Sequence, residues 1–202
     1  TVVFNKNSYE YIFKSGDVVA LEDSTNKLPF EIISSAAYQD KFIPNKDYYP
    51  KNYNQNASYW YRIKVRFNED LDKTSVIEFF DQVTDYIDAY FPDENGKYVK
   101  ASTGADLRFQ DRLFKHKNFE FLIQNLKKGE YYYYFKVKSK DKVNVIIVFR
   151  TVERFIQYSL TEYLTYGLFY GMIFIFSFHN LLMYLAVRRK QYLYYILYII
   201  SV

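Results

Sequence analysis

The residues best suited to hold a ligand are an aromatic and a cationic side chain that lie two positions apart. Trp60 and Arg62 occur in the segment ASYWYRIKVRF, in which polar and apolar residues alternate. An indole face can stack on the apolar C–H face of a sugar ring, and a guanidinium presents a planar set of donors to hydroxyls or anions. The pair therefore indicates either a ligand-binding surface or an arginine stacked on a tryptophan to cover the outside of a sheet.

Two other parts of the chain could enlarge that surface. Alternation over 131–139 places two tyrosines and two lysines, at the even-numbered positions from Tyr132 to Lys138, on one face of a strand. The irregular polar stretch 103–118 contains two arginines and a histidine that would form a rim. The candidate ligand-binding residues are Trp60, Arg62, Arg108, Arg112, His116, Tyr132 and Tyr134.

The chain offers little for catalysis. A glycosidase needs two carboxylates that face one cleft, and the spacing of Asp81, Asp85, Asp88 and Asp93 indicates no such pair. No nucleophile elbow surrounds a serine, and His116 is the one histidine outside the apolar stretch described below. Without cysteine, the scattered acids provide at most a weak Ca²⁺ site. We therefore expect a chain that is not an enzyme and that has neither a metal site nor a cofactor.

Short strands must position the candidate residues. Runs of aromatic and β-branched residues separated by turn residues predict strands over 2–4, 9–13, 18–21, 57–67, 75–80, 83–91, 97–101, 119–126, 131–139 and 143–152. One short helix is predicted near 29–37, and helices do not alternate with strands. This order favours a mainly β domain over residues 1–155, a β-sandwich of jelly-roll type. The last strand is almost continuously apolar, so it should be central.

Alternation within 57–67 predicts which side chains face the core. The odd-numbered residues from Tyr59 to Phe67 are all apolar or aromatic, and we expect them inside. The even-numbered residues from Ser58 to Arg66 are mostly basic and include Trp60, so they should face solvent.

An uncharged stretch of 25 residues, 163–187, follows this domain. As a helix it would be roughly 37 Å long, enough to cross a hydrocarbon core of about 30 Å. The alternative is a buried helix of a soluble domain, but such helices are usually shorter and keep a polar stripe. We expect a linker over 153–162, a first membrane span over 163–187, a loop over 188–191 and the start of a second span beyond it.

Charges at the two ends of the span indicate its orientation. Arg188, Arg189 and Lys190 follow it directly, whereas 151–162 contains one arginine and two glutamates. Since positively charged loops remain cytoplasmic, residues 1–162 should lie on the extracytoplasmic side of an inner membrane that the chain crosses several times.

Residues inside the span predict contacts with other helices. Gly167 and Gly171 have the spacing that lets two helices approach closely. His179 and Asn180 are polar groups that would hydrogen-bond to a neighbouring helix within the bilayer. A lone anchor needs neither pair, so the span should belong to a bundle.

Both ends of the sequence suggest part of a longer protein. The first residue is Thr1 rather than Met and no export signal follows it, so we expect any such signal to have been removed or left out. The apolar run 192–202 has only 11 residues, too few to cross a bilayer. We therefore expect the output of the protein to follow Val202. The expected partners are the lipid bilayer and a small-molecule or carbohydrate ligand, with a homodimer through the missing output region left open. A net charge of +4 is too mild to indicate nucleic acid.

Four motifs occur in the order of a known family. They are ALEDSTNKLPFEIISSAAYQDKFIP, the Trp-x-Arg strand in NASYWYRIKV, the Phe-x-x-Arg and His-x-x-Phe run in GADLRFQDRLFKHKNFEFLI, and the span YGLFYGMIFIFSFHNLLMYLAVRRKQYLYYILY. In this order the chain resembles bacterial seven-transmembrane receptors with diverse intracellular signalling modules, the 7TMR-DISM family. The resemblance covers nearly the whole sequence.

That resemblance implies a sensor domain similar to carbohydrate-binding modules, a bundle of seven helices, and a cytoplasmic output such as a histidine kinase or a diguanylate cyclase. It does not identify the ligand. Two other functions stay open: a membrane-anchored, glycan-binding adhesion or scaffold module that does not signal, and a membrane-tethered hydrolase.

Overall fold

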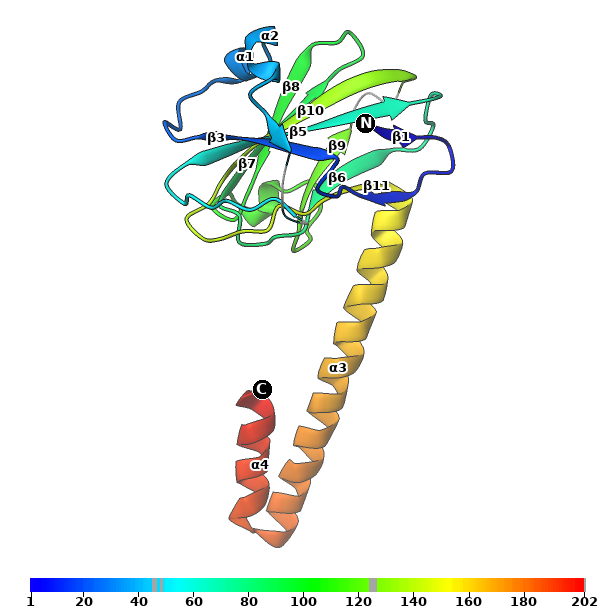
Figure 1. The fold of residues 1–202 in the computed structure, drawn as a ribbon. Helices are drawn as coiled ribbons and strands as arrows, with labels where there is room; N and C mark the ends of the chain where they lie inside the picture. Colours follow the sequence, from blue (N-terminus) through cyan, green and yellow to red (C-terminus); the bar gives the residue numbers. More distant parts are fainter. Residues whose placement is uncertain (45–46, 48, 124–126, 202) are drawn as a thin grey trace. The chain divides into compact units, whose positions relative to one another are not determined.

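The computed structural model describes residues 1–44, 47, 49–123 and 127–201 (Figure 1). These residues form two compact units, Thr1–Arg154 and Phe155–Val202. We describe each unit by itself.

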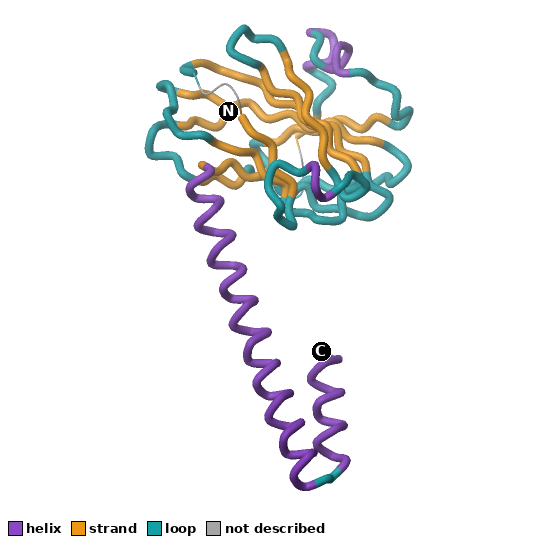
Figure 2. The backbone as a smooth tube through the Cα atoms, turned by 180° about the vertical axis from the view of Figure 1, so that it is seen from behind, coloured by secondary structure: helices purple, strands orange, loops and turns teal. Residues whose placement is uncertain are grey.

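The first unit contains two sheets, and strands dominate it (Figure 2). The larger sheet has seven strands among the described residues. Its order is β4 (Ile43–Pro44), β3 (Val18–Asp23), β5 (Ser58–Phe67), β10 (Gly129–Lys138), β7 (Tyr86–Pro92) and β8 (Tyr98–Thr103), with β1 (Val2–Phe4) pairing with the end of β5. The β1–β5 pair is parallel and the other pairs are antiparallel.

The smaller sheet has four antiparallel strands in the order β2 (Glu10–Ile12), β11 (Ile147–Thr151), β6 (Ser75–Phe79) and β9 (Phe119–Ile123). Aromatic side chains join the two sheets, because Phe4 of β1 lies 4.2 Å from Phe149 of β11 and Phe135 of β10 lies 5.1 Å from Phe79, between ring centroids. One buried cluster includes residues of both sheets. The predicted β-sandwich is confirmed, and so is the central position of the last strand.

The odd-numbered residues of β5 behave as alternation predicts. Tyr59, Tyr61, Ile63, Val65 and Phe67 are all buried in the core that the two sheets share. Strands β7 and β11 begin three and four residues later than predicted, at Tyr86 and at Ile147. The predicted strand residues 124–126 lie outside the described residues.

Two short helices replace the single helix predicted over 29–37. They are α1 (Phe30–Ile33) and α2 (Ala36–Gln39), and a 3-10 turn, η1, follows at Phe109–Asp111. Ser35 separates α1 from α2 because its backbone is extended, with ψ 154°. The ring of Phe30 stacks on that of Tyr90, with 4.2 Å between centroids and 4° between planes. The two helices thereby cover part of the outer face of the larger sheet.

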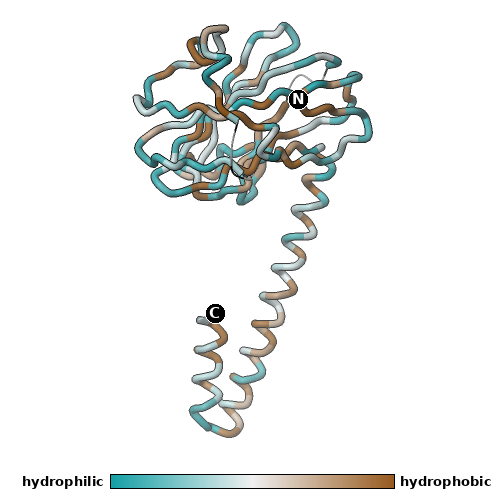
Figure 3. The backbone as a smooth tube through the Cα atoms, in the orientation of Figure 1, coloured by the Kyte–Doolittle hydropathy of each residue, from teal (hydrophilic) through white to brown (hydrophobic). Residues whose placement is uncertain are grey.

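The second unit is helical. The long helix α3 (Val152–Val187) is the one helix among the described residues that is long and apolar enough to cross a membrane. Apolar residues recur along it in Figure 3. It includes the predicted span. The prediction of a separate linker over 153–162 was wrong, because those residues already belong to α3. They include good helix formers and neither glycine nor proline, which explains the continuous helix.

A left-handed residue ends this helix. Arg188 has φ 53°, and its N–H donates to the Tyr184 carbonyl at 2.7 Å. Helix α4 (Lys190–Ser201) then begins, and it runs back beside α3 in both views (Figures 1 and 2).

Among the glycines of the sandwich, Gly104 should be the least tolerant of substitution. A Cβ atom there would lie 2.0 Å from the Asp85 carbonyl oxygen, and its φ of +154° is unfavourable for other residues. We expect Gly104→Ala to destabilise the fold by about 1–3 kcal/mol or more, because backbone atoms must shift. Thermal unfolding measures this, with Gly16→Ala, which has nothing within 4 Å, as the control. Equal melting temperatures for the two variants would contradict the packing described here.

Candidate functional site

The indole of Trp60 does not face solvent as predicted. Its exposed fraction is 0%, and it is buried in a second apolar cluster with Ile33, Phe42 and Tyr134. Trp60 is buried because the segment that carries α1 and α2 folds over the outer face of β5. The ammonium of Lys136 lies 5.4 Å from its ring centroid.

Arg62 lies at the margin of that cluster. Its guanidinium stands 4.4 Å from the ring centroid of Phe42 and 5.3 Å from that of Tyr132, and it donates to the side-chain oxygen of Gln39. The amide of Gln39 in turn donates to the Tyr134 hydroxyl at 3.2 Å. The structure thus brings together four of the candidate residues, Trp60, Arg62, Tyr132 and Tyr134, but α1 and α2 cover part of the surface that they form. Ligand binding by this group stays a prediction.

The arginines and the histidine of the stretch 103–118 do not all form a rim around Trp60, which corrects the expectation for that stretch. Arg112 donates to the carbonyls of His116 and Lys117, at 3.0 and 3.2 Å, and stands 4.6 Å from the ring of Phe119 in the smaller sheet. His116 is buried, with an exposed fraction of 2%. Arg108 is exposed, directly before η1.

His116 belongs to a buried polar network on the outer face of the smaller sheet. Its Nδ1 lies 3.1 Å from Oε1 of Glu120 on β9. The β6–β9 register places Glu120 directly opposite Glu78. Asn118 donates to Glu78 at 2.7 Å, and Arg150 of β11 forms an ion pair with the other oxygen of Glu78.

Burial raises the pKa of both Glu78 and Glu120, although hydrogen bonds and positive neighbours oppose the effect. Two carboxyls directly opposite each other in a sheet repel when ionised. The guanidinium of Arg150 and the imidazole of His116 are therefore the groups that make this pair of acids tolerable inside the protein.

The network continues to the beginning of α3. Arg150 also binds Glu10 of β2 at 2.6 Å, and Glu10 pairs at 3.1 Å with Arg154, which lies in the first turn of the helix. Burial acts to raise the pKa of Glu10, but the hydrogen bonds and charges of Arg150 and Arg154 outweigh it and hold that pKa below its usual value. We name the chain of contacts Glu78–Arg150–Glu10–Arg154 the root network.

Other contacts hold the same turn. The N–H of Val152 donates to the Thr74 carbonyl at 2.9 Å, and Lys73 lies 3.8 Å from Glu153. The first turn of α3 is therefore bound to β2 and to the segment that leads into β6.

Comparison with protein families identifies the chain. The family of 7TMR-DISM extracellular 2 domains matches residues 15–151, and the 7TM diverse intracellular signalling family matches residues 162–202. The chain belongs to the 7TMR-DISM receptors. It is thus part of a transmembrane signalling receptor with an extracellular sensor domain, and the resemblance drawn from its motifs is confirmed.

Other comparisons add little to this assignment. No curated protein matches the chain. Among solved structures, it is similar to the enzymatically active domain of tailspike protein 4 from bacteriophage CBA120, at 12% identity and a TM-score of 0.27. That match covers 72% of this chain and 19% of the tailspike chain, and so low a score supports no argument about fold or function.

Three groups of this 7TMR-DISM sensor domain have the composition of a metal site. Potential ligand atoms of Glu78, His116 and Glu120 lie within 4.8 Å of one another, and all three residues are buried. However, both oxygens of Glu78 already accept hydrogen bonds, one from Asn118 and one from Arg150. The cluster is therefore better described as part of an ion-pair network than as a metal site.

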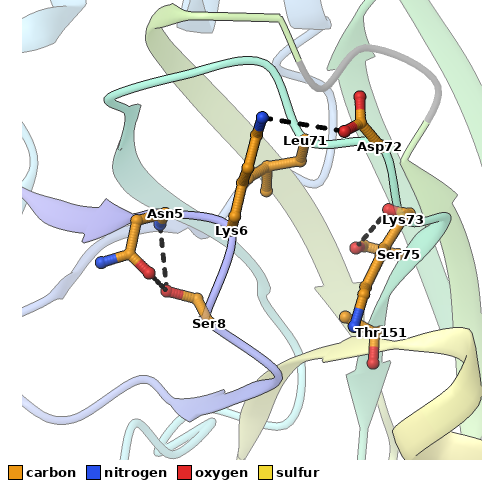
Figure 4. A pocket seen from close by; sticks show the side chains of 8 residues that line it. All are labelled: Asn5, Lys6, Ser8, Leu71, Asp72, Lys73, Ser75 and Thr151. Atoms are coloured by element: carbon orange, nitrogen blue, oxygen red, sulfur yellow. Dashed lines mark hydrogen bonds and ion pairs between the residues drawn. The ribbon is translucent and has the colours of Figure 1, made fainter.

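A small cavity lies beside the root network (Figure 4). Its volume is about 100 Å³, well below the ~300 Å³ of the smallest usual ligand pockets. Figure 4 shows Lys73 extending toward Thr151, the last residue of β11. Lys6, also in its lining, lies 3.8 Å from Asp72. The cavity separates the β1–β2 turn from the strand that leads into α3.

The sequence motifs did not point to Glu78, Glu120 or Arg150. A signal was present, because Glu78, Glu120 and Arg150 are each a single charged residue within an apolar strand segment. A charge at such a position is rarely buried without a partner, so each one predicts an ion pair.

Arg150 is expected to be the most sensitive residue of the root network. Arg150→Ala leaves Glu78 buried without its guanidinium, and loss of one partner from a buried pair typically costs about 3–5 kcal/mol. Chemical denaturation of the chain in detergent measures this cost. Arg66→Ala, which removes an exposed ion pair with Glu130, is the matched control and should change stability little. Similar losses for both variants would show that Arg150 has no special role.

Glu120 should make stability depend on pH. A carboxyl whose pKa is raised on folding stabilises the protein below its unfolded pKa near 4.5, and this contribution is lost as the pH rises through the folded pKa. Glu120→Gln imitates the protonated form. We therefore expect the melting temperature of this variant to rise relative to that of the wild type as the pH increases above about 4.5. A difference that does not change with pH would contradict the prediction.

Proposed function

We propose that this chain is the sensory and first membrane-spanning part of its receptor, and that a ligand held by the sandwich alters the first turn of α3. The observation that supports this most directly is the root network. Arg150 and Arg154 share the carboxylate of Glu10, so the central strand β11 and the helix that continues from it are held by one set of charges.

The proposal requires a ligand with different affinities for two arrangements of this junction, since a ligand that binds both equally shifts nothing. Buried ion pairs suit such a role because they have discrete partners. Arg154 is the weaker point, with 45% of its side chain exposed, against 5% for Arg150. Loss of the Glu10–Arg154 pair would remove one of the contacts that hold the helix turn and leave the ion pairs of Arg150 in place.

In this proposal residues 1–162 are extracytoplasmic, the chain crosses the inner membrane several times, and the basic residues Arg188, Arg189 and Lys190 face the cytoplasm. Gly167 and Gly171 have no heavy atom within 4 Å of the position that a Cβ would occupy, which leaves room for a neighbouring helix. His179 and Asn180 would face the same bundle.

The ligand that we propose is a carbohydrate. We also propose that catalysis belongs to a cytoplasmic output domain, and that a homodimer would form through that domain. The alternative, an adhesion or scaffold module, binds glycan equally well but predicts no change at the junction.

Hydrogen–deuterium exchange of the chain in nanodiscs separates these two functions. Glycans that raise its melting temperature would first be selected from a broad panel. We expect a selected glycan to change the exchange of residues 152–162. Arg154→Ala, which removes the contact to Glu10 but not the Arg150–Glu78 pair, should still bind the glycan and lose that change. Binding to the wild type with unchanged exchange at 152–162 would contradict the signalling function and favour the scaffold.

A further inference from the structure

A larger opening lies at the β4–β3 edge of the sandwich, away from every residue of the root network. A cleft of about 300 Å³ has Ala20, Tyr59 and Tyr61 among its lining residues, together with Ile43 and Tyr53. A second cleft of about 410 Å³ shares Tyr53 with it. We call the two together the edge cleft. Their volumes are within the usual range for sites of small ligands.

The edge cleft exposes apolar surface that a ligand could cover. Ile43 is 65% exposed and Tyr53 is 66% exposed, although both are large hydrophobic residues. Tyr61 provides a second indication. Its hydroxyl is buried and has no hydrogen-bond partner among the residues that the structure describes. A buried polar group of this kind is costly unless something satisfies it, and a hydroxyl-bearing ligand would do so.

Positive charge lies at the point where the two parts of the cleft meet. Lys51 lines both parts, and Lys142 lines the second. Both lysines are exposed, and neither forms an ion pair with a described residue. The acid in the lining, Glu22, is already engaged, since it accepts hydrogen bonds from Asn54 at 2.9 Å and from the Tyr59 hydroxyl at 3.1 Å. A free cationic pair therefore borders an apolar surface.

The segments that carry these lysines are held together. The buried side chain of Asn52 donates to the Asp141 carbonyl at 2.6 Å and accepts from the N–H of Val143 at 2.8 Å. Lys51 and Asn144 also form a backbone bridge. The lysines are thus attached to a fixed pair of segments, so little backbone order would have to be gained on binding.

We propose that the edge cleft binds a sugar acid, with the sugar ring against Tyr53 and Ile43 and the carboxylate between Lys51 and Lys142. The inference rests on the proposed function, because it names the chemical class of the carbohydrate and a place for it. A tyrosine ring suits the C–H face of a pyranose, and two ammonium groups suit one carboxylate. The site lies on the inner side of β3 and β5, not around Trp60.

Paired sugars test the charge requirement. Isothermal titration of the chain in nanodiscs would compare glucuronic acid with glucose and N-acetylmuramic acid with N-acetylglucosamine, since each pair differs by an acidic group. We expect the acid of at least one pair to bind at least about tenfold more tightly than its neutral counterpart. Equal affinities within both pairs, or no binding by either acid, would overturn the proposal.

Variants then test the position of the site. Lys51→Gln and Lys142→Gln should each remove most of the preference for the acid, and Tyr53→Ala should weaken binding of both members of a pair. Lys97→Gln, in the exposed β7–β8 turn, is the control and should change neither. All four side chains are exposed, so melting temperatures should stay near that of the wild type. An unchanged preference in both lysine variants would exclude the edge cleft.

Two results would distinguish a failure of the edge cleft as a binding site from a failure of the proposed signalling function. Acid binding in the cleft without altered exchange at 152–162 would support the site and contradict the signalling function. A different ligand that alters exchange at 152–162 while sugar acids fail to bind would do the reverse.

Discussion

The burial of one guanidinium determines how the membrane-linked side of this sandwich is built. Arg150 lies in the central strand of the smaller sheet and is 4% exposed, so its charge must be matched inside the protein. Glu78 and Glu10 match it from the two neighbouring strands. Taking such charges out of water is expensive, and it becomes tolerable only when every partner is in position. The register of β2, β11 and β6 is therefore tied to one residue.

The same constraint explains the loop that covers this face. Glu120 lies opposite Glu78, which would place two acids side by side on one surface. His116 reaches Glu120 from the irregular segment before β9, and Arg112 holds the carbonyls of that segment. The loop thus supplies the positive and hydrogen-bonding groups that the sheet lacks. The two central strands, β6 and β11, are buried on both faces.

Local patterns predicted most of the strands and failed where distant segments meet. Alternation was sufficient for the inner face of β5, because a period of two is a property of the strand itself. It could not place Trp60, whose cover is provided by α1 and α2 from some thirty residues earlier. It likewise could not pair Glu10 with Arg150, which are 140 positions apart. Residues 153–162 were predicted to be a linker, yet their charged and polar side chains are compatible with a helix.

In the proposed receptor, a signal from the edge cleft to α3 would pass through the core, because strands of the larger sheet line the cleft and α3 follows β11 of the smaller sheet. Strand β1 is suited to this task. It pairs with residues 65–67 at the far end of β5, the strand that also carries Tyr59 and Tyr61, and its Phe4 ring lies 4.2 Å from that of Phe149. Phe149 immediately precedes Arg150, and its side chain points to the opposite face of β11. Closely packed interiors shift between discrete arrangements. A displacement of β1 that moved the Phe149 ring would therefore also move Arg150, and with it the contacts of the root network.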